Sequence, residues 1–267
     1  MRKLSAPLLL LRNEISKALR RKLPYFGLFA VTVLCLVIYA AADQLSQASS
    51  ANAWGYVAFS MLLVFNDLGL IFIIVFAALL FSEETDSGTI RATLAAPVHR
   101  WELYLAKAIT GLLYMLVLWS VALLVSIVLA RIRYHFGAIT DAFGVVYPRG
   151  TVFRIFLLGF VLSWVPLAAL VMYGLFISTL IRSPGAAVAV GIGTIYLIDF
   201  TKHLVGLDPY IFTRYIGYSW QILQLVAQGV DYQWQPEIWR MLTLSIGCAV
   251  LAMSAGAALF QWRDLNG

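Results

Sequence analysis

Six long apolar runs constrain this chain more than any other feature of its sequence. Each has a length suited to crossing the hydrocarbon core of a bilayer as an α-helix, and together they occupy residues 25–42, 57–81, 103–130, 154–181, 184–206 and 236–261. Only 12% of the residues are charged, whereas a soluble domain typically carries about 25%. The sequence therefore predicts an all-α membrane protein with six transmembrane helices.

The distribution of Lys and Arg residues predicts the orientation of the spans. With the N-terminus inside, the inner side holds the seven basic residues of 2–22 together with Arg91, Arg100, Lys107, Arg182 and Arg263, and the outer side holds the other seven. Because cytoplasmic loops carry the excess of basic residues, we expect a multi-pass inner-membrane protein with both termini in the cytoplasm. The outer segment "RIRYHF" is a local exception. This topology explains the net charge of +6, so we expect no nucleic-acid partner.

Residues 1–24 predict an amphipathic helix that lies in the inner membrane interface, in contact with lipids. Apolar side chains recur there at helical spacing, namely Leu8, Leu11, Ile15, Leu19 and Leu23. The remaining surface carries the polar positions Arg12, Glu14, Lys17, Arg20 and Arg21. The alternative is a basic flank that only sets the topology. We expect residues 25–267 to form a single six-span transmembrane domain.

The outer segment 207–235 is rich in Tyr, Phe and Trp. Asp208 as cap and Pro209 as first residue favour one helix that ends at Gly217. Ser219 favours a second helix that stops at Gly229. We therefore expect an outer helical hairpin, which acts either as a lid or as a simple interfacial anchor.

Two groups of polar residues lie inside the predicted spans. Asn66 and Asp67 lie in the second span, and Asp199, Lys202 and His203 lie toward the outer end of the fifth. Ionisable residues are costly in lipid and mark functional sites, so these five residues are candidates for a translocation path or gate. The alternatives are hydrogen bonds across helices for Asp67 and a structural ion pair for Asp199.

The chain carries no phosphate loop, no HExxH or GxSxG motif, no paired carboxylates and no Cys/His cluster. We therefore predict a protein that is not an enzyme and that holds no metal or cofactor. Cys35 and Cys248 lie in apolar runs and are interpreted as small buried hydrophobic residues. Any energy for active transport must come from an ion gradient or from a partner chain.

The stretch "EETDSGTIRATLAAPVHRWELYLAK", residues 83–107, resembles the loop between the second and third spans of type-2, export-class ATP-binding-cassette permeases. The matching positions are Glu84, Asp86, Gly88, Thr89, Pro97, Val98, Arg100 and Lys107. His99 and Ala106 depart from the usual Ser and Gly. "RNEISKALRRKLPYF", with Glu14, resembles the family's N-terminal helix, and "FQWRDL" resembles its C-terminal end.

The resemblance implies a cytoplasmic coupling loop, residues 83–102, that contacts a separate ATPase. Thr85 or Ser87 would cap a short coupling helix that Pro97 ends. The implied contact residues are Glu84, Asp86, Gly88, Thr89, Arg91, Pro97, Arg100 and Lys107, with the N-terminal helix beside them. ATP and Mg would bind in the partner ATPase, and a second permease copy would complete a homodimer. From the residues alone, an ordinary solvated loop is an equal alternative.

Three functions remain open at this point. The first is the membrane subunit of an exporter driven by the ATPase. The second is a force-transmitting subunit that acts on an extracytoplasmic accessory protein, as in metalloenzyme maturation or cell-surface machinery. In that case the basic loop 131–154 and the aromatic segment would be docking surfaces. The third is an ion-coupled carrier that uses Asp67 and Asp199.

Overall fold

The structure is a computed structural model that describes residues 5–42, 52–89, 99–141, 144–230 and 237–262. Within these residues six helices are long and apolar enough to span a membrane, which confirms the predicted class. They are α2 (Lys22–Ala40), α4 (Leu68–Asp86), α6 (Arg100–Arg133), the combined length of α7 (Arg149–Leu162) and α8 (Trp164–Leu180), α9 (Pro184–Val205) and α11 (Glu237–Trp262).

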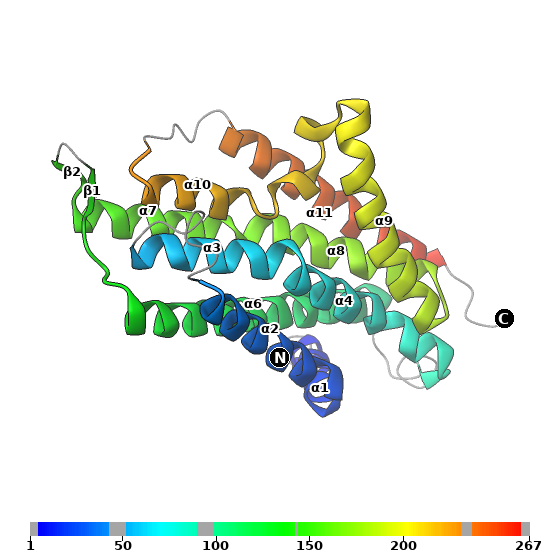
Figure 1. Ribbon diagram of the computed structural model, residues 1–267. Helices are drawn as coiled ribbons and strands as arrows, with labels where there is room; N and C mark the ends of the chain where they lie inside the picture. Colours follow the sequence, from blue (N-terminus) through cyan, green and yellow to red (C-terminus); the bar gives the residue numbers. More distant parts are fainter. Residues whose placement is uncertain (1–4, 43–51, 90–98, 142–143, 231–236, 263–267) are drawn as a thin grey trace.

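The bundle is organised around α6 and α8 (Figure 1). Helix α8 packs against α4 and α11, while α6 contacts α2, α3 (Ala53–Asn66) and the N-terminal helix α1 (Ser5–Arg20). Glycine allows the closest approach: a Cβ on Gly174 of α8 would lie 2.7 Å from the Cβ of Ala77 on α4. Small residues at such contacts let membrane helices pack closely.

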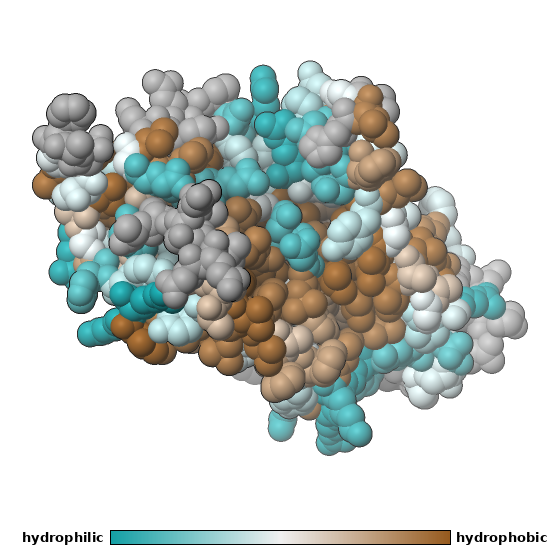
Figure 2. Space-filling model, viewed as in Figure 1, coloured by the Kyte–Doolittle hydropathy of each residue, from teal (hydrophilic) through white to brown (hydrophobic). Residues whose placement is uncertain are grey.

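Large apolar side chains cover much of the outside of the bundle. Phe29, Phe200 and Leu251 are each at least 66% exposed. On the side of the molecule that Figure 2 shows, hydrophobic residues form a broad band with hydrophilic residues along its edges. Exposure of this kind suits a surface that faces lipid rather than water.

Two of the predicted spans are broken where they were expected to be continuous. The run 57–81 folds as α3 and α4, which are separated at Asp67 with φ −125° and ψ −88°. The polar pair of Asn66 and Asp67 favours a break because short polar side chains compete with the helical backbone hydrogen bonds.

The fourth span breaks at Ser163, three residues before Pro166. The Ser163 hydroxyl donates to the Phe160 carbonyl (2.8 Å) and lies 3.1 Å from the donating indole nitrogen of Trp119. Pro166 lies in the first turn of α8, where its missing N–H leaves no hydrogen bond unmade.

Segment 207–235, expected on the outer side, differs from the predicted pair of helices. The first helix is replaced by two 3-10 turns, η1 (Asp208–Tyr210) and η2 (Phe212–Tyr215), and only α10 (Tyr218–Ala227) is an α-helix. Leu207 and Gly217 are the N-caps, so neither Asp208 nor Ser219 has the predicted capping role. Ser219 is buried within α10 instead. Gly229, with φ +82°, follows the helix as predicted, and residues 231–235 lie outside the described residues.

The loop after α6 contains an antiparallel hairpin of β1 (Ile139–Asp141) and β2 (Gly144–Tyr147). The sequence analysis did not predict these strands. They project from one end of the bundle (Figure 1).

Candidate functional site

Four charged residues from three helices meet at the end of the bundle where α6 begins. We call Glu14, Lys17, Glu84 and Lys107 the four-charge cluster. The Lys17 ammonium nitrogen lies 2.7 Å from Glu14 Oε1 and 2.8 Å from Glu84 Oε1. The Lys107 ammonium nitrogen lies 2.8 Å from Glu14 Oε2 and 2.9 Å from Glu84 Oε2. Each lysine therefore bridges α1 to α4, and the cluster has no net charge.

Helix α1 brings Glu14 and Lys17 to one face because they are three residues apart. Leu8 and Leu19 are 66% and 60% exposed on the same helix, so they are available to the membrane interface. Arg12 and Arg20 are also exposed. This arrangement agrees with an amphipathic helix whose polar face is held by the protein and whose apolar side chains meet lipid.

Three of the four members of the cluster are almost completely removed from solvent. Lys107 is fully buried, and Glu14 and Glu84 are 3% and 5% exposed. Lys107 also donates to the Leu80 carbonyl (2.8 Å) and lies 5.1 Å from the centre of the Phe81 ring. Buried charges are tolerated when they are paired and hydrogen-bonded, and removal of one partner is strongly destabilising.

Lys17 lies at the more open side of the cluster, with its side chain 34% exposed. Partial burial alone lowers the pKa of Lys17, but hydrogen bonds and charges from Glu14 and Glu84 outweigh it and raise this pKa above the usual value. Lys17 therefore keeps its charge to a higher pH than an ordinary lysine, and its pairing is lost only as the pH rises through this raised pKa. Nearby, Arg21 lies 2.8 Å from Glu83 and adds a second link between the N-terminal region and α4.

Arg100 makes a different intrachain contact. Its guanidinium donates to the carbonyls of Gln261 (3.0 Å) and Phe260 (3.3 Å) at the C-terminal end of α11. A cation at the last carbonyls of a helix is favourable because it satisfies free acceptors and meets the negative end of the helix dipole. Arg100 thereby connects the beginning of α6 to the end of α11.

The rest of the predicted coupling loop is only partly described. Asp86 is exposed at the end of α4, and Gly88 follows with φ +70°. The hydroxyls of Thr85 and Ser87 donate to carbonyls of α4, those of Phe81 (2.8 Å) and Glu83 (2.7 Å). Thr85 lies in the last turn of α4 and Ser87 is its C-cap residue. Their role as caps of a coupling helix stays a prediction.

The structure describes only some of the remaining loop residues. Thr89 is exposed, with its hydroxyl 2.9 Å from that of Ser87. Arg91 and Pro97 lie outside the described residues, as does most of the predicted coupling helix. Where α6 begins, the amide of His99 donates to the Glu102 carboxylate (3.2 Å), so the unusual His99 occupies an ordinary helix-capping position.

Three of the five candidate gate residues converge on one small cavity of about 70 Å³. The break between α3 and α4 places Asn66 and Asp67 there, opposite Asp199 of α9. Thr213 of η2 also lines the cavity, and its buried hydroxyl has no hydrogen-bond partner among the described residues. The two polar groups that the sequence analysis treated separately therefore share a polar space.

Lys202 does not line this cavity and instead forms ion pairs with carboxylates beside it. It contacts Asp199 (2.5 Å) and lies 3.7 Å from Asp208, which also pairs with Arg214. The sequence analysis missed Asp208 and Arg214, because it considered only residues within one helix. His203 belongs to α9, and its side chain is not among those described. No group of three His, Cys, Asp or Glu residues that could hold a metal ion occurs in the described part of the chain.

Comparison with known proteins agrees with the architecture. The family described as ABC-2 family transporter protein matches residues 10–199, more than two thirds of the chain. The match includes most of α1 and all of α4 and α6, and so covers every residue of the four-charge cluster. No curated protein matches the chain.

Proposed function

This chain belongs to the ABC-2 transporter family, and we propose that it couples ATP hydrolysis by a separate ATPase to export of a substrate. Membership makes it a multi-pass membrane permease subunit with an ATPase partner. In this proposal it lies in the inner membrane with both termini in the cytoplasm, and ATP and Mg bind to the partner. The four-charge cluster is the observation that carries the proposal.

The cluster gives the coupling a physical basis. Segment 87–99 connects α4 to α6, and the cluster joins these two helices to α1. A push by the ATPase on segment 87–99 therefore moves three helices together, because separating them would leave buried charges unpaired. Packed bundles respond to such a push by switching between discrete arrangements rather than by continuous deformation.

A second copy of the chain would complete the pathway. Helices α9 and α11 are the least buried of the long apolar helices, so they have free apolar surface for a homodimer contact. Exposed Ala189 and Gly193 on α9 would allow close approach of a second helix. Two permease copies would then meet two ATPase copies at the cytoplasmic side.

Substitution of Gly88 in the complex of the permease with its ATPase tests whether this loop couples ATP hydrolysis to the permease. Gly88→Pro should abolish the stimulation of ATP hydrolysis by the permease, since proline cannot adopt φ +70°. Gly88→Asn is the matched control, because asparagine tolerates this conformation better than other side chains. It should keep most of the stimulation. Normal stimulation in the proline variant would contradict the assignment of this loop.

The cavity at Asp67 and Asp199 is proposed as part of the translocation gate. Its support is the convergence of polar groups at a helix break inside a span. In a chain with Cys35 and Cys248 replaced by alanine, Asp67→Cys should react with a membrane-impermeant maleimide at rates that differ between ATP-bound and ATP-free complexes. Val145→Cys on the exposed hairpin is the control and should react equally in both. Equal rates at position 67 would mean that the cavity has only a structural role and takes no part in gating.

The alternative function is transmission of force to an extracytoplasmic partner. The projecting β1–β2 hairpin and the neighbouring basic positions of 131–154 favour it as a docking surface. Stable purification of the complex with a protein from the outer side would support this alternative. A substrate bound between two permease copies would support export.

A further inference from the structure

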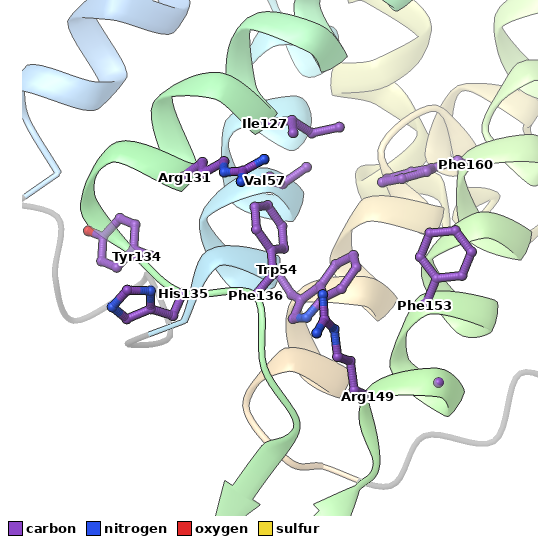
Figure 3. Close-up of a pocket in the computed structure, with 11 residues that line it drawn as sticks. Trp54, Val57, Ile127, Arg131, Tyr134, His135, Phe136, Arg149, Phe153 and Phe160 are labelled. Carbon is purple, nitrogen blue, oxygen red and sulfur yellow. The ribbon is translucent and has the colours of Figure 1, made fainter.

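A large cavity lies at the opposite end of α6 from the four-charge cluster. Its volume is about 930 Å³, and it is formed by α3, the end of α6 and the start of α7 (Figure 3). Lys107 and Arg131 are 24 positions apart on α6, which corresponds to about 36 Å along a helix. The cavity therefore lies about one membrane thickness from the cluster.

Apolar and aromatic side chains make one wall of this cavity. Trp54, Val57, Ile127, Phe153 and Phe160 line it. The Trp54 indole is held by a hydrogen bond to the Gly137 carbonyl (3.1 Å) and by edge contact with Phe136, with ring centres 4.8 Å apart. The wall is thus formed without a ligand, as is common in binding sites for apolar groups.

Two arginines from different helices bring positive charge to the same space. Arg131 extends from the end of α6 and Arg149 from the first turn of α7, and both guanidinium groups point toward the space between the helices (Figure 3). Neither forms an ion pair within the described residues, and none of the described residues that line the cavity is acidic. The start of α7 adds the positive end of a helix dipole.

We propose that this cavity binds an anionic phospholipid. The phosphate is held by Arg131 and Arg149, whose planar forks match phosphate geometry, and the upper acyl chains lie against the aromatic wall. The two arginines lie where the distribution of basic residues disfavours them in the proposed orientation. A bound anion compensates for this charge. Both features are needed together: a free anion would leave the apolar wall in water, and a neutral lipid would leave two arginines without a counter-charge.

The proposal is tested with the full chain in neutral detergent by native mass spectrometry during titration with phosphatidylglycerol. The wild-type protein should bind phosphatidylglycerol more tightly than phosphatidylcholine, and the affinity should fall as salt rises. Arg131→Gln with Arg149→Gln should weaken the binding of phosphatidylglycerol by at least tenfold, since charge-assisted hydrogen bonds are lost. Arg154→Gln, an exposed arginine of α7 that does not line the cavity, should bind within about twofold of the wild type.

Several outcomes would overturn the lipid assignment. One is equal binding of phosphatidylcholine and phosphatidylglycerol to the wild-type chain, which does not depend on whether any variant folds. Another is competition by inorganic phosphate at the same concentration as the lipid, which would mean that the acyl chains contribute nothing. A third is an unchanged lipid affinity in the double variant together with loss of a co-purifying outer protein. That result would assign the arginines to protein docking.

Discussion

The Lys107 ammonium group is shared by two carboxylates and a backbone carbonyl, in a place with no exposure to water. Its removal leaves Glu14 and Glu84 with Lys17 as the only remaining ammonium group of the cluster. Because the two carboxylates are buried on neighbouring helices, their mutual repulsion is weakly screened. At the residue scale, we therefore expect replacement of Lys107 to be strongly destabilising.

Lys107→Met should destabilise the protein by about 3–5 kcal/mol, the usual cost of breaking a buried ion pair from one side. Lys22→Met is the control, because Lys22 is exposed at the start of α2, and it should change stability by less than about 0.5 kcal/mol. Thermal unfolding of both variants in detergent measures the difference. Equal midpoints would show that the cluster does not stabilise the fold.

The sequence named each member of the cluster without showing that they meet. Glu84 and Lys107 were predicted through the resemblance of the loop, and Glu14 and Lys17 through the N-terminal helix. Glu84 and Lys107 were assigned to contact with the ATPase, and Glu14 and Lys17 to the helix in the membrane interface. Their contacts join positions 93 and 67 residues apart, and no helical spacing reports contacts at that range. The side chains of this group contact each other, so in the proposed function they influence the ATPase only through the helices that carry them.

At the scale of elements, hydrophobicity and length were sufficient to predict the spans but not their interruptions. The six apolar runs correspond to the long helices because backbone groups in lipid must be satisfied within each segment. The break at Asp67 and the 3-10 turns of η1 and η2 depend on packing against α9, α10 and α11. The β1–β2 hairpin is short and exposed, so it has little periodic signal.

Contact between α6 and α11 gives a prediction at this scale. A Cβ on Gly256 would lie 2.2 Å from the Tyr104 hydroxyl, whose ring stacks on Phe81 beside the cluster. Gly256→Ala should therefore destabilise the protein by about 1–3 kcal/mol through overpacking. Gly247→Ala on the same helix meets nothing within 4 Å, and it should be neutral or stabilising by up to about 1 kcal/mol. Thermal unfolding distinguishes them, and similar midpoints would contradict the close packing.

At the scale of the whole molecule, the chain has two contrasting ends. One end is bound together by buried charges that cancel each other, and the other has a wide cavity with two arginines that lack an ion-pair partner among the described residues. Helix α6 passes from one to the other. The interruptions at Asp67 and Ser163 lie between these ends, where two spans can bend. A push at the bound end is thus expected to change the geometry of the open end.

Spin labels can follow this motion in the complex with the ATPase, in a chain without native cysteines. Labels at exposed Asn13 and Trp101 report the distance between α1 and α6, which should stay constant between nucleotide states. Labels at Asn13 and exposed Val190 report the distance between α1 and α9, which should change. The reverse pattern would mean that α1 moves independently of the span that it contacts.

The four-charge cluster also has a consequence for synthesis on the ribosome. Glu14 is made 93 residues before Lys107, a delay of roughly 5–20 s at ordinary rates of translation. During that interval α1 has no buried partner from α6, and its exposed leucines can keep it at the membrane surface. The N-terminal helix thus waits beside the membrane until the third long helix arrives and completes its charge pairs.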